Sequence, residues 1–226
     1  MSESSPPAIA ILDYGMGNRR SVQKALQHVG AAAAITGDHD QIRAADGLVV
    51  PGVGAFPQAM RNLTEQGLDE LIRERAAARV PTLGICLGMQ LLFDGSDELG
   101  CTAGLGLIGG EVTRLRTGGL RLPHIGWNEV AFVRPSALTE ELPEAGCAFY
   151  HVHSHAARPS DAADLAGLTE YGERFATIVA HENIFGVQFH PEKSSTPGLR
   201  MLASFARLCA PQPTPPATAA RAGAGR

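Results

Sequence analysis

A cysteine between two glycines is the residue of this chain best suited to covalent chemistry. Cys86 follows residues 80–85, whose apolar and β-branched side chains predict a buried strand, and it precedes residues 87–93, which predict a helix. Gly84 and Gly88 allow the sharp strand-to-helix turn that pushes one side chain out at the carboxyl edge of a sheet. A thiol there lies at the positive end of a helix, which favours the thiolate. The spacing therefore predicts a nucleophilic cysteine.

A histidine and a glutamate about a hundred residues downstream could complete the site. Alternation along residues 187–190 predicts a strand that places Gln188 and His190 on one face. Pro191 ends the strand and keeps His190 extended, and Glu192 is near enough to hold the imidazole in the required tautomer. Taken alone, this tripeptide is more typical of a strand end followed by a solvated charge. Together with the cysteine turn, it predicts the nucleophile, base and carboxylate of a triad.

A glycine-rich segment after another strand could supply an oxyanion site. Residues 47–50 predict a buried strand beside the one that leads to the cysteine, and it is followed by Gly52, Val53 and Gly54. Glycines let backbone amides approach a developing negative charge, and the amide of Leu87 is the natural second donor. The alternative is an ordinary tight turn after a strand.

The elements that must position these residues alternate between strand and helix in the first half of the chain. Apolar strands are predicted over residues 8–12, 47–50 and 80–85, and helices over 21–29, 58–66 and 68–79. Strands dominate the second half, at 109–115, 127–133, 149–154 and as a hairpin-like pair over 176–190, before a last helix over 197–209. This order predicts an α/β three-layer sandwich with a mostly parallel central sheet and extra antiparallel strands in the second half.

Composition bounds the domain organisation and excludes some classes of function. The 226 residues carry a net charge of −4 with no basic or acidic run, which gives no support to binding of nucleic acid or of a membrane surface. The four cysteines show no disulfide framework, and neither a membrane span nor a signal peptide is evident. We expect a soluble cytoplasmic protein with one domain over residues 8–209, between disordered ends at 1–7 and 210–226.

Residues 84–90, taken with residues 190–192, resemble the signature of the triad (class I) glutamine amidotransferases. Further segments resemble one family within that class, the glutaminase subunits of imidazole glycerol phosphate synthase: residues 13–18, 51–56, 126–128, 150–154 and 190–194. The triad signature is shared across the class, while the first-strand loop and the Gly-Trp-Asn segment are more specific to this subunit. The resemblance covers almost everything between residues 8 and 209.

The resemblance implies a reaction and roles for named residues. Cys86 would attack the side-chain amide of glutamine, His190 would transfer the protons and Glu192 would orient His190. Backbone groups of Gly54 and Leu87 would contact the oxyanion or the substrate. The family's substrate-binding positions correspond here to Gln90 and Glu98 for the amino-acid head, and to His153 and Ser154 near the substrate carboxylate. No cofactor and no metal are implied.

A partner is also implied. Ammonia would pass to a (β/α)8-barrel cyclase, which would form imidazole glycerol phosphate and aminoimidazole carboxamide ribotide. The expected interface residues are Asn18, Trp127, Asn128, Tyr150 and Lys193. For Trp127 the alternative is a core position, and for Lys193 it is a solvated charge.

One segment departs from the family pattern. His151, His153 and His155 stand where related subunits more often have aromatic residues at the first and last of these positions. Histidines at every second residue of a strand share one face, which is a possible metal-ligand layout. No acidic second shell is evident nearby, so substitution within a polar surface on the substrate side is the favoured interpretation.

Other functions share parts of these patterns. The chain could serve another amidotransferase, in aminobenzoate, anthranilate, purine or pyrimidine synthesis. A stand-alone γ-glutamyl or peptide hydrolase could use the same three residues without a partner. A non-catalytic ligand-binding module would be signalled by the loss of Cys86, His190 or Glu192, all of which are present.

Overall fold

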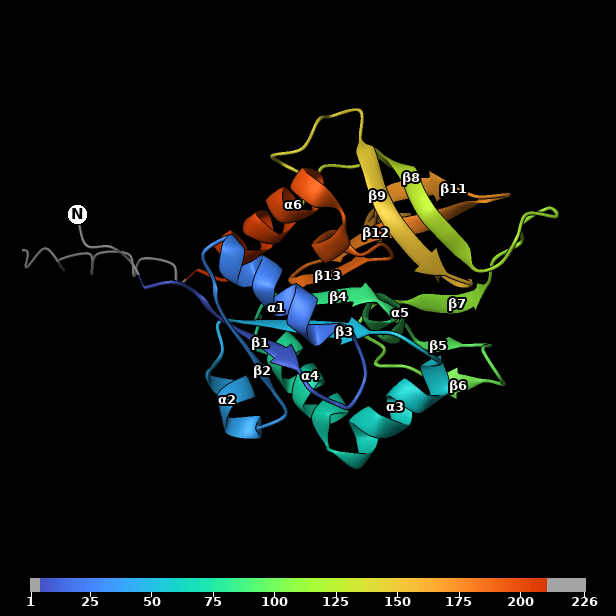
Figure 1. Cartoon of the computed structure of the whole chain (residues 1–226). Coiled ribbons are helices and arrows are strands. Elements are labelled where there is room, and N and C mark those ends of the chain that lie inside the picture. The colour runs from blue at the N-terminus through green and yellow to red at the C-terminus, as the bar shows by residue number, and fades with distance from the viewer. Residues whose placement is uncertain (1–4, 211–226) are drawn as a thin grey trace, which may run out of the picture.

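A computed structural model describes residues 5–210 of the chain (Figure 1). The disorder predicted at 1–7 and 210–226 concerns residues that lie almost entirely outside this described part. Within it, no helix is both long and apolar enough to cross a membrane.

Parallel strands form the half of the main sheet that ends at the predicted cysteine turn. Their order is β2-β1-β3-β4-β13, and every neighbouring pair is parallel. The strands are β1 (Ala8–Leu12), β2 (Ala32–Thr36), β3 (Gly47–Gly52), β4 (Thr82–Cys86) and β13 (Ile184–Val187). β4 lies between β3 and β13, so Cys86 emerges at the centre of the carboxyl edge. The predicted parallel sheet is confirmed.

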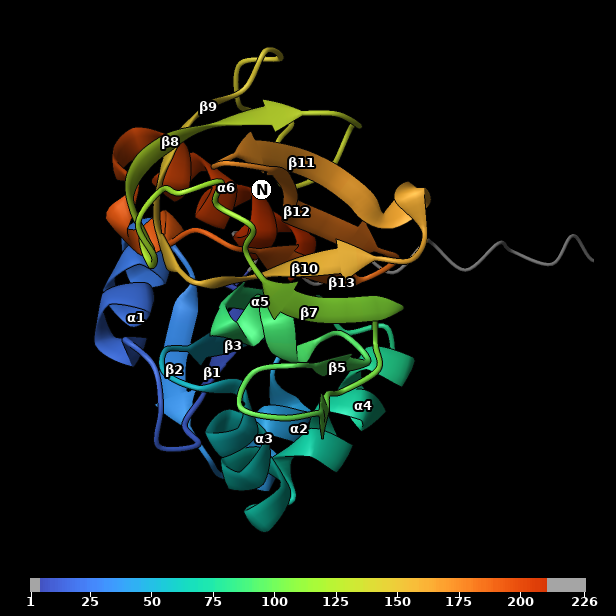
Figure 2. The same cartoon turned by 90° about the vertical axis from the view of Figure 1, so that its right-hand side faces the viewer.

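The main sheet continues as an antiparallel half in the order β12-β11-β8-β9, which gives nine strands in all. These strands are β12 (Arg174–His181), β11 (Leu165–Glu170), β8 (His124–Phe132) and β9 (Cys147–His153). A smaller sheet in the order β10-β7-β5-β6 lies beside it (Figure 2). Its strands are β10 (His155–Pro159), β7 (Gly110–Arg114), β5 (Gly95–Ser96) and β6 (Thr102–Ala103). The extra antiparallel strands expected in the second half are present.

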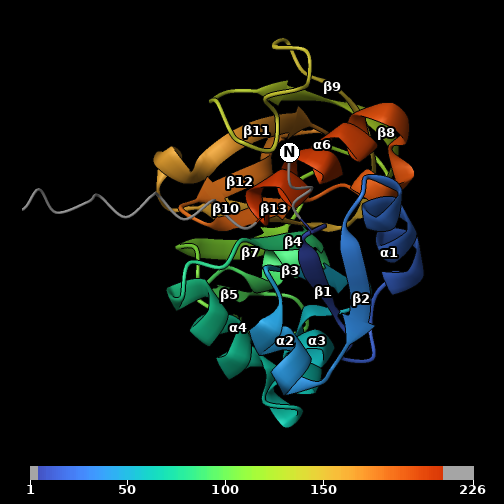
Figure 3. The same cartoon turned by 90° about the vertical axis from the view of Figure 1, so that its left-hand side faces the viewer.

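Helices cover both faces of the parallel half, as Figures 1 and 3 show from two sides. One face packs against α1 (Arg19–His28) and α6 (Ser195–Leu208). The other packs against α2 (His39–Ala44), α3 (Phe56–Glu65), α4 (Leu68–Ala77) and α5 (Leu87–Leu91). Along β1, Ile9 and Ile11 belong to the first layer and Ala10 and Leu12 to the second. This period of two makes the fold the predicted three-layer sandwich.

Some element boundaries differ from the sequence expectation. β3 runs on through Pro51 to Gly52 instead of ending at Val50, because its pairing with β4 continues to the Gly52–Cys86 register. β13 ends at Val187, and a short 3-10 helix, η2 (Pro191–Lys193), follows it. A second 3-10 helix, η1 (Ala162–Asp164), precedes β11. The backbone after β3 is therefore carried up to the level of Cys86.

Candidate active site

The turn at Cys86 has the strained geometry that its flanking glycines predict. Cys86 has φ +56° and ψ −112°, which a side-chain-bearing residue rarely adopts. A Cβ on Gly88 would collide with the carbonyl oxygen of Val50, and one on Gly84 would lie 2.6 Å from the carbonyl oxygen of Gly88. Only glycines fit at these two positions, where α5 packs closely against the sheet. Because Gly84 and Gly88 have no side chains, the backbone can make the sharp turn that places Cys86 between strand and helix.

His190 and Glu192 meet beside this cysteine and are deeply buried. His190 Nδ1 lies 3.0 Å from Glu192 Oε1, and both side chains are almost completely inaccessible to solvent. Burial alone would lower the pKa of His190, but its hydrogen bonds to Cys86 and Glu192, together with their negative charges, raise it to about 10. The raised pKa describes a protonated His190 beside the sulfur of Cys86.

The backbone around His190 is fastened to strand β9. The His190 amide donates to the carbonyl oxygen of Tyr150 at 2.9 Å. Ser194 Oγ donates to the carbonyl oxygen of His190 at 2.6 Å and accepts from the Tyr150 amide at 3.0 Å. These bonds replace the strand pairing that ends at Val187, so the base is held rigidly although it lies in a loop.

The predicted oxyanion segment lies next to the nucleophile. Gly52 pairs in register with Cys86, and a Cβ at Gly52 would lie 2.8 Å from the backbone nitrogen of Gly88. Gly54 has φ +102°, a conformation that favours glycine. Val53, Gly54 and Leu87 line the same cavity as the cysteine. The backbone of this segment can therefore reach a negative charge that develops at Cys86.

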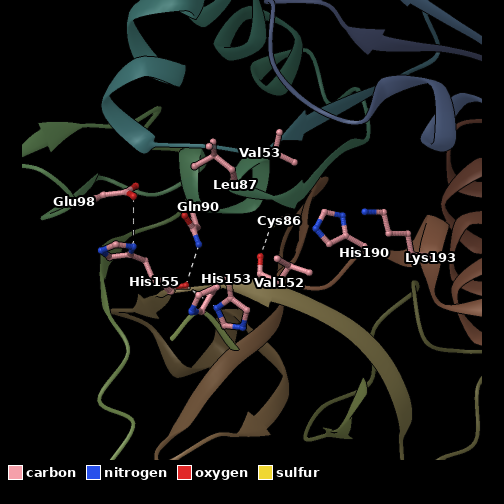
Figure 4. A pocket seen from close by; sticks show the side chains of 13 residues that line it. Val53, Cys86, Leu87, Gln90, Glu98, Val152, His153, His155, His190 and Lys193 are labelled. Carbon is pink, nitrogen blue, oxygen red and sulfur yellow. Dashed lines mark hydrogen bonds and ion pairs between the residues drawn. The ribbon is translucent and has the colours of Figure 1, made fainter. Parts of the chain in front are cut away.

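A cavity of about 270 Å³ opens in front of Cys86 (Figure 4). It contains most of the sequence-predicted site residues, namely Val53, Gly54, Cys86, Leu87, Gln90, Glu98, His153, Ser154, His190 and Lys193. Pro123, Val152 and His155 also line it. Val152 lies within the family-like segment 150–154, whereas no motif in the sequence pointed to Pro123. Glu98 and His155 stand at one end and His190 and Lys193 at the other, with Cys86 between them.

The end of the cavity near Glu98 is suited to an ammonium group. Glu98 Oε2 accepts from the Phe56 amide at 2.8 Å, and Oε1 lies 3.7 Å from His155 Nδ1. Gln90 Nε2 donates to the carbonyl oxygen of His155 and to Gln188 Oε1, both at 3.0 Å. Gln90 Oε1 thus has no hydrogen-bond partner within residues 5–210 and is free to accept. A carboxylate and an amide oxygen together make a cation-binding pair.

His153 reaches the cavity wall with both ring nitrogens already engaged. Its Nδ1 donates to the carbonyl oxygen of His155 at 2.8 Å, so its Nε2 must accept, from His124 Nδ1 at 3.1 Å. Burial lowers the pKa of His153 to about 3, which keeps the ring neutral. A substrate carboxylate at this wall would therefore meet Ser154 and backbone groups more readily than the imidazole.

The expectation for the histidine segment is wrong in two respects. The ring of His151 does not line the cavity: it is fully buried, contacts Phe149 O and Thr177 Oγ1 at 3.0 Å each, and stacks on His124. His155 does not share its face, because the chain leaves β9 after His153 and His155 begins β10 in the other sheet. Within residues 5–210 no group of three or more histidine, cysteine, aspartate or glutamate side chains is arranged so that it could hold a metal ion.

The predicted interface residues lie on different faces of the strand pair β8–β9. Trp127 is 53% exposed and makes an edge contact with Tyr150 at 6.2 Å between ring centroids, which excludes the alternative of a core position. Ile125, on the same face of β8, is 60% exposed. Asn128 points the other way and donates to the carbonyl oxygen of Glu170 at 2.9 Å. Asn18 is the residue before α1.

Tyr14 and Gln188, two buried residues to which the sequence assigned no role, lie close to the predicted triad. The Tyr14 hydroxyl donates to the carbonyl oxygen of Pro51 at 2.5 Å, and burial, reinforced by the charge of Cys86, raises the pKa of Tyr14. Gln188 Nε2 lies 3.9 Å from Cys86 Sγ. The strand alternation that places Gln188 on the face of His190 was the available signal for the second residue.

Comparison with known proteins identifies relatives over most of the chain. Residues 10–208 match the family described as "Glutamine amidotransferase class-I". The protein "Imidazole glycerol phosphate synthase subunit HisH" of Moorella thermoacetica is 53% identical over 200 residues, which are 88% of this chain and 94% of that protein. Its namesakes in Methylococcus capsulatus and Bacillus cereus are 50% and 47% identical, over 88% and 87% of this chain and 96% and 93% of theirs.

Solved structures share the fold at lower sequence identity. A putative GMP synthase protein from Thermoplasma acidophilum superposes with a TM-score of 0.71 at 20% identity, over 92% of this chain and 96% of that one. PurLQS from Thermotoga maritima superposes with a TM-score of 0.71 at 16% identity, over 90% of this chain and 97% of that one. These similarities support the α/β architecture.

Proposed function

Because the chain belongs to the class I glutamine amidotransferase family, and within it to the HisH subunits of imidazole glycerol phosphate synthase, we propose that it releases ammonia from glutamine for histidine biosynthesis. The observation that carries this proposal is the strained Cys86 turn facing the buried His190–Glu192 pair. The names of the relatives argue against a role of this chain as the glutaminase of an amidotransferase in aminobenzoate, anthranilate, purine or pyrimidine synthesis.

The chemistry we propose begins with the Cys86 thiolate. Its sulfur attacks the side-chain amide carbon of glutamine, and the carbonyl electrons move to the oxygen. Backbone N–H groups of Val53, Gly54 and Leu87 then donate hydrogen bonds to this oxyanion. His190 gives its proton to the leaving nitrogen as the C–N bond breaks, which yields ammonia and a thioester. Water then attacks the thioester and gives a proton to His190, and glutamate leaves as the C–S bond breaks.

Substrate orientation follows from the charges along the cavity. The α-ammonium of glutamine lies at Glu98 and the free carbonyl oxygen of Gln90, and the α-carboxylate lies toward Ser154. Glu192 keeps Nδ1 of His190 protonated, so that Nε2 faces the sulfur. The reacting amide is thereby fixed between the nucleophile and the base.

The partner we propose is a (β/α)8-barrel cyclase. Ammonia that escaped into water would be protonated and lose its nucleophilicity, so a sealed path to a second enzyme is chemically required. The docking surface is the exposed face formed by Ile125, Trp127 and Tyr150, extended by Lys193, which lines the cavity. We assign Asn18, the residue before α1, to the same surface on the family resemblance. Asn128 belongs behind this surface, where it holds β8 against β11. We place the complex in the cytoplasm, consistent with four free cysteines within residues 5–210.

Glutamate release by the purified chain tests this function. We expect weak release alone and a steep rise when a cyclase barrel bearing its nucleotide ligand is added. High turnover by the chain alone, unchanged by any barrel and extending to γ-glutamyl peptides, would support the stand-alone hydrolase instead.

A further inference from the structure

Gln188 is a buried amide that the mechanism above leaves without a role. It lies between the end of β13 and His190, and its residue surface is completely inaccessible to solvent. Its backbone amide donates to the carbonyl oxygen of Thr177 at 2.9 Å, which anchors it to β12. Its side chain lies between Gln90 Nε2, at 3.0 Å, and Cys86 Sγ, at 3.9 Å.

The hydrogen bonds fix which end of this amide faces the sulfur. A carbonyl oxygen can only accept, so the atom of Gln90 that contacts the His155 carbonyl oxygen must be Nε2. The same Nε2 contacts Gln188, so Gln188 must present Oε1 to it. The remaining end of Gln188, the donor Nε2, is therefore directed at Cys86 Sγ.

A thiolate at Cys86 would require hydrogen-bond donors, and few of the groups around the sulfur can donate. Val152 O lies 3.7 Å from Cys86 Sγ and can only accept, so it favours the protonated thiol. The Tyr14 hydroxyl already donates its proton to Pro51 O, so it is not available to the sulfur. Lys193 lines the same cavity, but no hydrogen bond joins it to the sulfur within residues 5–210. Among the ionisable groups within residues 5–210, His190 is the one that donates to the sulfur, and in the proposed mechanism it gives up its proton during each turnover.

We propose that Gln188 is a further catalytic residue, whose Nε2–H donates a hydrogen bond to the Cys86 sulfur and stabilises its thiolate. The role deepens the proposed function and rests on it for its place in turnover. When the thioester breaks, the C–S electron pair returns to the sulfur. The uncharged amide of Gln188 can then donate its N–H to the sulfur whether or not His190 is protonated. Because the same amide is bonded to Gln90, the residue that binds the substrate head is also linked to the nucleophile.

The test measures the thiolate directly and requires no glutamine. The rate of Cys86 alkylation by iodoacetamide is followed against pH by peptide mass spectrometry in the full chain and in Gln188→Leu. We expect the pH of half-maximal rate to rise by about 1 unit in the variant, which is about a tenfold loss of thiolate at pH values below the wild-type midpoint, since one hydrogen bond to a charged group is removed. Thr177→Val is the matched control: it removes an equally buried polar group that contacts His151 and not the sulfur, and its profile should stay at the wild-type position.

Gln188→Met guards against a folding defect in the leucine variant. Its side chain matches glutamine in length but has no N–H to donate to sulfur, so the pH of half-maximal rate should rise as it does in Gln188→Leu. Thermal midpoints identify the folded variants. A folded Gln188→Leu or Gln188→Met with the wild-type alkylation profile would overturn the proposal. If the wild-type chain released no glutamate with any partner while the profiles still shifted, the proposed function would fail and this assignment would stand.

Discussion

At the residue scale, Cys86 differs from the other cysteines in what surrounds its sulfur. Cys101 is exposed, and burial raises the pKa of Cys209 to about 12 and, to a lesser degree, that of Cys147. A chloroketone analogue of glutamine should therefore label Cys86 alone. Cys86→Ser should lower glutamine hydrolysis by about 10⁶-fold with little change in thermal midpoint, because serine has no thiolate form at neutral pH. Equal labelling of all four cysteines would contradict the prediction.

The carboxylate beside His190 provides a second residue-scale prediction. Glu192→Gln places an amide donor at His190 Nδ1, which favours the wrong tautomer, so hydrolysis should fall by about 10⁴-fold, less than on loss of the nucleophile. Glu182→Gln is the control, because Glu182 forms an exposed ion pair with Arg79. Steady-state rates of glutamate release check both variants. If Glu182→Gln were the damaging change, Glu192 would be the wrong carboxylate.

Side-chain roles could be predicted only where neighbours in sequence reveal them. The flanking glycines predict the role of Cys86, and Glu192 lies two residues from His190. The roles of Cys86 and Glu192 could therefore be predicted from local spacing alone. Gln188 and Tyr14 act through contacts with Cys86 and Pro51, which lie far from them in the sequence. The buried position of His151 depends on β8 and β12, which a pattern along one strand does not contain.

At the scale of elements, the pair β8–β9 encloses three neutral histidines. Burial lowers the pKa of His124, and burial together with neighbouring histidines lowers that of His151 and His153 to about 3. The bonds run in one direction, from Asn128 Nδ2 through His124 to His153 and on to the His155 carbonyl oxygen. Protonation of His124 or His153 would set two donors against each other in this chain, so the folding of the two strands depends on pH.

This cluster predicts a specific loss of stability in acid. An unfolded histidine takes up its proton near pH 6.5, whereas His151 in the fold does so near pH 3, so stability should fall as pH decreases through that window. His151→Phe should reduce the slope of unfolding free energy by about 1.4 kcal/mol per pH unit there. His28→Asn, at an exposed position, is the control. Urea unfolding at several pH values measures both, and an unchanged slope in His151→Phe would contradict the assignment.

The strand and helix patterns in the sequence predicted most elements of the fold but not all of them. The apolar runs of β1, β3 and β4 were strong enough to predict a parallel sheet. β2, with the sequence Ala-Ala-Ala-Ile-Thr, was missed because alanine gives little strand signal, and its place comes from pairing with β1. The crossing from β9 to β10 after one intervening residue has no breaker in the sequence, so the segment looked like one strand.

At the scale of the whole molecule, the proposed docking surface makes a prediction about partnership. Trp127→Ala should weaken binding of the cyclase barrel by roughly 30-fold, as expected for an aromatic anchor, while the thermal midpoint of the isolated chain changes little. Leu99→Ala, at an 86% exposed position that follows Glu98 and belongs to neither β8 nor β9, is the control. Titration of glutamate release against barrel concentration gives the affinity. Loss of stability without loss of affinity would place Trp127 among structural residues.

Lys193 makes a parallel prediction for ammonia transfer. It lines the cavity beside His190, so Lys193→Ala should increase the share of ammonia that escapes to solvent when the partner is bound. Lys24→Ala, the same change at the other lysine of the chain, lies on α1 and serves as the control. The ratio of free ammonium to glutamate in the medium is the measurement. An unchanged ratio in Lys193→Ala would remove this residue from the transfer path.

The exposed position of Trp127 has a spectroscopic consequence. It is the only tryptophan in the sequence. Fluorescence excited at the long-wavelength edge of the tryptophan absorption band therefore comes from this one indole. A half-exposed indole emits at long wavelength, and burial against another protein surface shifts the emission to the blue or quenches it. A barrel without tryptophan could thus be followed as it arrives, by stopped flow and without any label, on the time scale of a single turnover.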